Sequence, residues 1–398
     1  MTNAYIYIDN YVQLSSAHNP VTLRLVVAEN LVYTTEMLRS AIAKRTLATV
    51  ASTEKVLPKK YGGRFVVTLI PGDGVGKEVT DSVVSVFEAE NLPIDWDRVD
   101  ISGLDHEEGV AAAVQSLKRN KVGLKGIWHT SAADQAGKGS LNVALRKHLD
   151  IYANVALFKS VPGVRTRIPD VDLVVIRENT EGEYSGLEHE SVPGVVESLK
   201  IMTEAKTERI ARFAFDFAKK YNRQAVTAVH KANIMKLGDG LFRNVVTRVG
   251  EQEYPDIRVN SIIVDNASMQ TVAKPHQFDV LVTPSMYGTI LGNIGAALIG
   301  GPGLVPGANY GREYAVFEPG SRHVGLDIKD QNIANPTAMI LSAALMLDHL
   351  GLNTSASRIS NAVHQVIAEG KTTTPDIGGT ASTTEFTEAV IARLASMS

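Results

Sequence analysis

From residue 61 onward, two kinds of apolar pattern alternate along the chain. Short continuous runs of apolar, often β-branched residues predict buried parallel strands, because both faces of such strands are covered. The predicted strands are Phe65–Ile70, Gly126–Trp128, Leu173–Ile176, Ala225–Val229, Ser261–Val264 and Val280–Val282. Longer segments with helical spacing lie between or after them, namely Lys77–Glu90, Lys206–Tyr221, Gly240–Val249 and Thr337–Leu350. This alternation predicts an α/β fold, a doubly wound and mainly parallel sheet with helices on both faces.

The composition narrows the functional classes. With 398 residues, 44% hydrophobic and 21% charged, the chain has the balance of a soluble α/β protein long enough for one large or two medium domains. A net charge of -3 gives no electrostatic footprint for nucleic acid. The absence of cysteine excludes disulfides, a thiolate nucleophile and a cysteine-based zinc site. The apolar stretch Ala338–Leu347 is too short to span a bilayer.

The N-terminal region differs from the rest of the chain. Residues 37–53 contain Arg39, Lys44 and Arg45 but no acidic residue, which is typical of an amphipathic mitochondrial presequence. We therefore expect residues 37–60 to be a presequence region; the alternative is an ordinary surface helix. Residues 1–36 mix acidic and basic side chains and do not resemble a targeting signal, so we expect translation to start functionally at Met37.

A glycine-rich turn, Pro71 to Gly76, follows the first predicted strand and precedes a predicted helix. Its spacing, G-x-G-x-G, is neither the dinucleotide fingerprint nor a phosphate loop. We interpret it as a tight turn that lets the strand and the helix pack closely, rather than as a pyrophosphate site. Near the C-terminus, Ser382 to Glu385 predicts a capping box ahead of the last helix.

Several longer motifs occur in order along the chain. They are Ser140-Leu141-Asn142 with Arg146, Arg177-Glu178-Asn179-Thr180-Glu181-Gly182-Glu183-Tyr184, His230-Lys231-Ala232-Asn233-Ile234, and Asn335-Pro336. Together they resemble the β-decarboxylating dehydrogenases, the family of isocitrate and isopropylmalate dehydrogenases. The resemblance runs from about Tyr61 to the C-terminus.

The resemblance implies that most of a tricarboxylate site is retained. Oxidative decarboxylation of a 2-hydroxy tricarboxylate requires cationic donors that hold carboxylates, and groups that take up and deliver protons. The matching substrate-binding positions are Ser140, Asn142, Arg146, Arg177 and Tyr184. Tyr184 and Lys231 match the family's proton-handling residues. A third family arginine is missing, because its Asn-Val-Arg-Pro motif reads Asn154-Val155-Ala156-Leu157 here.

The metal-binding carboxylates are largely lost. In catalytic members three aspartates hold magnesium or manganese, which demand hard oxygen ligands. One of them is kept as Asp265, whereas the Tyr-Gly-Asp-Ile-Leu-Ser-Asp motif reads Tyr287-Gly288-Thr289-Ile290-Leu291-Gly292-Asn293. Thr289 and Asn293 are neutral, so we expect this chain not to catalyse alone.

The retained residues suggest a division of labour. In this family a lysine and an aspartate reach into the neighbouring subunit's active site. The resemblance therefore implies that Lys231 and Asp265 serve a partner, a catalytic isocitrate dehydrogenase chain that holds NAD and Mg²⁺ or Mn²⁺. We expect a regulatory subunit of a heteromeric mitochondrial enzyme of the citric acid cycle, acting in the matrix.

The segment that matches the family's NAD-binding loop is about one residue longer here. Asp327 and Ile328 still align with the pair that marks NAD rather than NADP use, while Arg322 is available for a phosphate. These features favour an adenine mononucleotide over a full dinucleotide, and the family resemblance implies that this nucleotide is AMP. The expected nucleotide-binding residues are Arg322, His323, Asp327, Ile328 and Asn335; the alternative is a surface loop without a ligand.

We expect a large domain of residues 62–151 and 300–398 and a small domain of 152–299. Within the small domain, about residues 182–206 should form an inter-subunit clasp. Two other functions stay open. One is an autonomous β-decarboxylating dehydrogenase of altered specificity, with a metal held by Asp265 and neutral oxygens. The other is a purely structural subunit that binds no small molecule.

Overall fold

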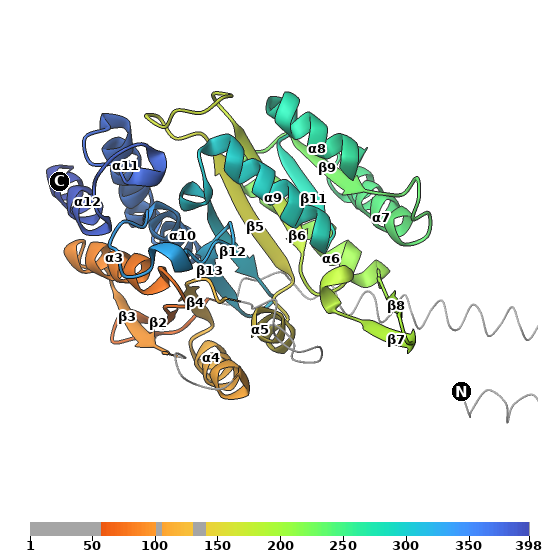
Figure 1. Cartoon of the computed structure of the whole chain (residues 1–398), viewed down its shortest axis with the longest axis horizontal. Helices are drawn as coiled ribbons and strands as arrows, with labels where there is room; N and C mark the ends of the chain where they lie inside the picture. The colour runs from red at the N-terminus through yellow and green to blue at the C-terminus, as the bar shows by residue number, and fades with distance from the viewer. Residues whose placement is uncertain (1–56, 101–105, 130–140, 398) are drawn as a thin grey trace, which may run out of the picture. The chain divides into compact units, whose positions relative to one another are not determined.

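The computed structural model describes residues 57–100, 106–129 and 141–397 (Figure 1). Residues 1–56, which include most of the predicted presequence region 37–60, and Ser140 lie outside these residues. Residues 57–60 are described, and Lys60 begins strand β1. The described chain forms an eleven-stranded sheet covered by helices, and a separate two-stranded sheet. This agrees with the predicted α/β fold class.

The main sheet contains all strands except β7 and β8. Its order is β1-β2-β4-β13-β12-β5-β6-β11-β9-β10, with β3 added beside β2. The bounds of its strands are β1 Lys60–Tyr61, β2 Arg64–Ile70, β3 Ile94–Arg98, β4 Val122–Lys125, β5 Ala153–Lys159, β6 Asp172–Glu178, β9 Ala225–His230, β10 Arg258–Ile263, β11 Val280–Thr283, β12 Pro306–Tyr310 and β13 Ala315–Pro319.

The helices lie on both faces of the sheet, as predicted. Their bounds are α3 Gly76–Ala89, α4 His106–Asn120, α5 Leu141–Leu149, α6 Glu204–Lys220, α7 Gly238–Glu253, α8 Val264–Ala273, α9 Ser285–Ile299, α10 Thr337–His349, α11 Asn353–Glu369 and α12 Thr383–Ser396. Among the described helices, none combines the length and the apolar composition that a bilayer crossing requires.

Strand direction is less uniform than the apolar runs predict. Strands β3, β2, β4 and β13 run parallel to one another, as do β6, β11, β9 and β10. The two sets are joined through β12 and β5, which pair antiparallel with each other and with their outer neighbours. The two parallel sets therefore run in opposite directions, and the predicted boundary between the large and small domains falls between β12 and β5. The two-domain division itself stays a prediction.

Burial on alternate faces explains the layers. In β2, Val67 and Leu69 pack with α3, whereas Ile70 packs with α4 and α5. In β6, Val174 and Ile176 pack against α6 and α7, whereas Val175 faces the core that includes α9. A continuous apolar run is thus needed wherever helices cover both faces.

Two strand predictions need correction. Gly126–Trp128 is not a strand; the strand is β4, which ends at Lys125. A Cβ on Gly126 would lie 1.7 Å from the carbonyl oxygen of Pro71, so this segment supports the glycine turn instead of continuing the sheet. Val264 belongs to α8 rather than to the preceding strand. The capping box at Ser382 and Glu385 is confirmed.

The predicted clasp contains the two-stranded sheet, formed by β7 (Glu188–Val192) and β8 (Val195–Ser198). Both strands are exposed throughout and carry apolar side chains, among them Val192 and Val196. In Figure 1 this hairpin lies beside α6, apart from the main sheet. Its role in holding a neighbouring subunit stays a prediction.

Candidate functional site

Cationic side chains converge at the junction between the two parallel sets of strands. Lys125 from the end of β4, Arg146 from α5 and Arg177 from β6 are all buried. They gather around one buried carboxylate, Glu318 of β13. The ammonium of Lys125 lies 2.5 Å from Glu318 Oε2, and an Arg146 guanidinium nitrogen lies 3.9 Å from Oε1. Cations outnumber this carboxylate, so the cluster favours an anionic ligand.

Arg146 is incompletely satisfied. Its buried Nη2 has no hydrogen-bond partner in the part of the chain that the structure describes. Burial lowers the pKa of Arg146 from its ordinary value. A buried cationic donor without an acceptor is costly, and a ligand carboxylate that accepts from it would remove this cost.

Arg177 is held from two sides. Its Nε donates to Asn154 Oδ1 at 3.3 Å and its Nη1 donates to the Thr289 hydroxyl at 2.8 Å. Burial, followed by the nearby Arg146, lowers the pKa of Arg177 to about 10. The guanidinium still carries its charge at neutral pH and has further donors available.

Two other predicted site residues adjoin these arginines. The Arg177 guanidinium carbon lies 5.8 Å from the centre of the Tyr184 ring. Asn142, in the first turn of α5, is buried and accepts a 3.4 Å hydrogen bond from Lys125 Nζ. The structure thus brings Asn142, Arg146, Arg177 and Tyr184 together.

The missing third arginine would lie on this same side of the sheet. Asn154 faces the cluster, and Ala156 follows it by two positions in the same strand, so both share a face. Ala156 is buried. A Cβ built on Gly320 would lie 3.0 Å from the Cβ of Ala156. The backbone after Glu318 therefore packs closely over the alanine.

The predicted metal positions do not fit a metal ion. The Thr289 hydroxyl accepts from Arg177, and Asn293 donates 2.9 Å to the Thr289 carbonyl. Among the described residues, no group of three His, Cys, Asp or Glu side chains could hold a metal ion. A donor set without its own carboxylates is unsuited to magnesium.

Lys231 and Asp265 form a separate pair. Lys231 follows β9, Asp265 follows β10, and their side chains meet at 2.5 Å. The side chains are 26% and 59% exposed, in contrast to the buried arginine cluster. The hydrogen bond from Lys231 lowers the pKa of Asp265. The pair thus presents a lysine and a carboxylate towards the surface.

A second cleft, of about 270 Å³, lies beside the glycine turn. Of the predicted nucleotide-binding residues, His323, Ile328 and Asn335 line it, and Arg322 and Asp327 do not. The Arg322 guanidinium instead lies 3.5 Å from Glu318 Oε1, in the cationic cluster. Sequence reasoning missed Asp376, which lines the cleft and accepts a 3.0 Å hydrogen bond from Asn335.

The glycine turn has the close packing that was predicted for it. Gly72 has φ +82°, and a Cβ there would lie 2.7 Å from the backbone of Gly126. A Cβ on Gly76 would lie 2.2 Å from the Pro71 carbonyl oxygen. Asp73 and Gly76 nevertheless line the second cleft.

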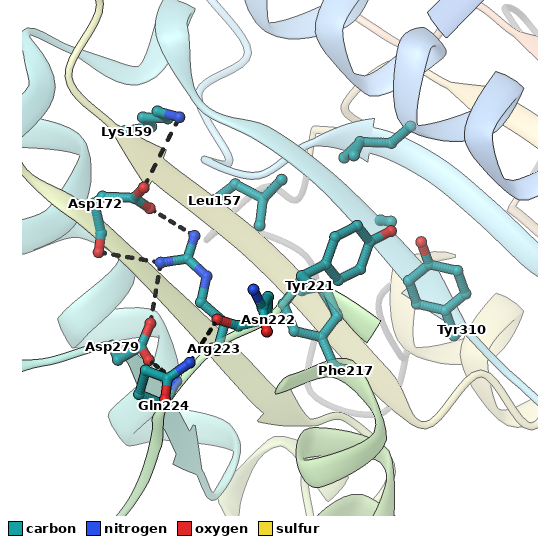
Figure 2. A pocket seen from close by; sticks show the side chains of 13 residues that line it. Leu157, Lys159, Asp172, Phe217, Tyr221, Asn222, Arg223, Gln224, Asp279 and Tyr310 are labelled. Carbon is teal, nitrogen blue, oxygen red and sulfur yellow. Dashed lines mark hydrogen bonds and ion pairs between the residues drawn. The ribbon is translucent and has the colours of Figure 1, made fainter. Parts of the chain in front are cut away.

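A further groove, of about 460 Å³, lies on the other face of β5 (Figure 2). Leu157, Phe217 and Tyr310 give it an apolar lining. Its main cation, Arg223, is held between Asp172 at 2.6 Å and Asp279 at 3.0 Å. This compensated charge does not favour a tricarboxylate, in contrast to the cluster around Arg146.

These features agree with comparisons to known proteins. The chain belongs to the isocitrate/isopropylmalate dehydrogenase family, whose sequence profile matches residues 66–390. A solved isocitrate dehydrogenase from Methylococcus capsulatus is 41% identical, with a TM-score of 0.78 over 83% of this chain and 99% of that one.

Two relatives specify the kind of protein more closely. The chain is 78% identical over 361 residues to isocitrate dehydrogenase [NAD] subunit 1, mitochondrial, of Saccharomyces cerevisiae, covering 91% of this chain and all of the relative. It is 51% identical to the mitochondrial gamma subunit from Homo sapiens, covering 85% and 86% of the two chains. The predicted family and the predicted mitochondrial location are thereby confirmed.

Proposed function

We propose that this chain is the regulatory subunit of a heteromeric NAD-dependent isocitrate dehydrogenase of the mitochondrial matrix. The reaction converts isocitrate and NAD to 2-oxoglutarate, carbon dioxide and NADH in the active site of a catalytic partner subunit, which holds NAD and Mg²⁺ or Mn²⁺. The partners form a heterodimer that assembles into a higher heteromer. The subunit names of the relatives support a multi-subunit enzyme.

The observation that carries the proposal is a cationic cluster beside metal positions that have lost their charge. Arg146 and Arg177 offer donors to a citrate or isocitrate carboxylate, with Asn142 and Tyr184 alongside; Ser140 completes the proposed set. Thr289 contributes its hydroxyl to Arg177 where a catalytic chain has a metal ligand. Such a site can bind a tricarboxylate as an effector without transforming it.

AMP is the proposed second effector. The cleft lined by His323, Ile328 and Asn335 is the proposed place for its adenosine part. Asp327, which precedes Ile328 in the chain, completes the proposed set. Because Arg322 faces Glu318, its proposed contact with a phosphate requires a different side-chain rotamer. Effector binding activates only by favouring a state of the heteromer in which the partner has a higher isocitrate affinity or turnover.

Lys231 and Asp265 are the proposed contribution to the partner's site. Their exposure and mutual pairing support this, because a residue that reaches a neighbouring subunit must lie at the surface. Lys231 would deliver or take up a proton there, and Asp265 would supply one oxygen ligand to the partner's metal.

The test uses the purified heteromer with Lys231→Ala in this chain. Turnover should fall by about 10²-fold or more, as expected when a group that transfers a proton is removed. The control is Lys219→Ala, at an exposed position of α6, which should leave turnover unchanged. Unchanged turnover in the Lys231 variant would refute the shared site.

Two further measurements address the other functions. The chain purified alone should show no NAD reduction with isocitrate and magnesium; robust turnover would identify an autonomous dehydrogenase. Calorimetry on a heteromer whose catalytic subunit cannot bind substrate should detect citrate and AMP. Absence of both signals would indicate a purely structural subunit.

A further inference from the structure

A buried carboxylate lies directly behind Lys231. Asp239 is in the first turn of α7, and its side chain is 0% exposed. One oxygen, Oδ2, accepts hydrogen bonds from the Lys231 backbone N–H at 2.6 Å and from the Tyr287 hydroxyl at 3.0 Å. The other, Oδ1, accepts from Lys200 Nζ at 2.7 Å. The carboxylate is therefore satisfied on both oxygens.

Lys200 supplies the charge that makes this burial possible. Its side chain is 15% exposed, and its ammonium also lies 3.0 Å from Glu183 Oε1. Burial alone would lower the pKa of Lys200, but the hydrogen bonds to Asp239 and Glu183 outweigh it and raise the pKa to about 12. Lys200 therefore carries its positive charge at neutral pH.

The Lys231 amide needs such a partner because strand β9 ends at His230. Beyond that point the sheet offers no ladder acceptor, and the chain turns: the Lys231 carbonyl accepts from the amides of Ile234 and Met235 at 3.0 and 2.9 Å. The amide of residue 239 returns to the Met235 carbonyl at 3.1 Å. Asp239 is thus bonded to both ends of this turn, through its own amide to Met235 and through its carboxylate to the Lys231 amide. The conformation of the turn then sets the direction of the Lys231 side chain.

We propose that Asp239 is a positioning residue for Lys231. Its carboxylate holds the Lys231 backbone so that the ammonium points to Asp265, and on the proposed function this is the direction of the partner's active site. The expected effect on turnover rests on the proposed function. The fixing of the Lys231 backbone by Asp239 does not.

The network also reaches the proposed effector site. Glu183 precedes Tyr184 in the short 3₁₀ helix η1 (Glu183–Ser185), and its other oxygen accepts from the Ser285 hydroxyl at 3.2 Å. Tyr184 adjoins Arg177. A change in η1 on tricarboxylate binding would therefore act on Lys200, Asp239 and the turn of Lys231 through direct bonds.

Asp239→Asn is the informative substitution. An amide keeps the shape but has a single acceptor oxygen, so its NH₂ group must face at least one of the three donors. The matched control is Asp279→Asn. Asp279 also holds backbone amides, those of Gln224 and Ala225, and an ion pair with Arg223, but at the opposite end of β9 (Figure 2).

Turnover of the heteromer is the first readout. With Asp239→Asn, kcat should fall about tenfold or more, because a small displacement of a reacting group is costly, while KM for isocitrate stays unchanged. Asp279→Asn should leave both constants unchanged. Provided that Lys231→Ala itself lowers turnover, an unchanged kcat in Asp239→Asn, or an equal loss in the two variants, would overturn the proposal.

Amide hydrogen exchange is the second readout, and it needs no variant that might fail to assemble. In the unmodified heteromer, the Lys231 amide should exchange far more slowly than an unprotected amide; free exchange would refute the proposal. If Lys231→Ala does not affect turnover but this amide is protected, and is released in Asp239→Asn, only the shared active site fails. If Lys231→Ala abolishes turnover and Asp239→Asn does not, only the positioning role fails.

Discussion

The guanidinium of Arg177 donates a 2.8 Å hydrogen bond to the hydroxyl of Thr289. The family resemblance implies a metal-binding aspartate at this position in catalytic chains. An aspartate at position 289 would neutralise part of the charge of Arg177. The neutral threonine instead orients the guanidinium and leaves its charge for a ligand. The loss of a metal ligand at position 289 and the proposed anion site around Arg177 are thus connected by this one hydrogen bond.

The first prediction concerns that contact. Thr289→Val removes the acceptor and leaves a buried guanidinium N–H unsatisfied, so citrate affinity should fall by roughly 1 kcal/mol, or about fivefold. Titration calorimetry on the heteromer with an inactive catalytic site measures it. Thr271→Val, which removes a buried hydroxyl bonded to the Ala267 carbonyl, is the control and should not alter citrate affinity.

The second prediction concerns the metal. Restoring carboxylates with Thr289→Asp and Asn293→Asp, four positions apart on α9, should create an additional Mn²⁺ site in the heteromer, because side chains at this spacing share a helix face. Electron paramagnetic resonance of free Mn²⁺ would measure the number of sites. The neutral pair Thr289→Asn with Asn293→Gln should add none; an equal gain in both variants would contradict the explanation by charge.

The third prediction concerns the missing arginine. Ala156→Arg should destabilise the fold by about 1–3 kcal/mol or more, because it places a much larger, charged side chain at a buried position that packs closely against Gly320. It should not strengthen citrate binding. Urea unfolding of the heteromer would report the first effect. Leu157→Met, on the opposite face and similar in volume, should cost less than about 1.5 kcal/mol.

The fourth prediction is a pH dependence of stability. Burial, followed by the nearby Lys159, lowers the pKa of His364 in α11 below its ordinary value of 6.5. The unfolded chain therefore binds the proton more readily, so this contribution to stability is complete above pH 6.5 and is lost as the pH falls towards the lower folded pKa.

His364→Gln should accordingly reduce the loss of stability between about pH 7 and pH 5, measured as urea midpoints across this range. The exposed His148 provides the control, and His148→Gln should retain the original slope. A larger loss of stability towards low pH in the His364 variant would contradict a lowered pKa of His364.

Part of the fold follows from the sequence for a physical reason. Strands β2, β6, β9 and β11 are covered on both faces, so each is a continuous apolar run. Strand β5 is equally buried but includes Asn154, whose amide donates 2.9 Å to Asn309 inside the sheet. Asn309 lies in the neighbouring strand β12. This buried polar pair interrupts the apolar pattern of both strands, and neither β5 nor β12 was predicted. Strand direction is not encoded in such runs at all.

The candidate site divides in a similar way. Arg146, Arg177 and Lys231 are located by motifs that extend over several residues. Lys125, Glu318 and Asp239 are not, because a single charge in an apolar segment gives no sign of the partner that compensates its burial. Those partners are distant in sequence: Lys125 and Glu318 are 193 positions apart and pair only once β4 and β13 are adjacent.

The antiparallel junction between β12 and β5 has a mechanical consequence. Arg146 belongs to the segment on one side of this junction and Arg177 to the strand on the other side. On the proposed function, a tricarboxylate bonded to both arginines would link the two parallel sets of strands at a fixed distance. The relative orientation of the two sets, rather than any chemical change in the ligand, is then the signal that a neighbouring subunit would receive.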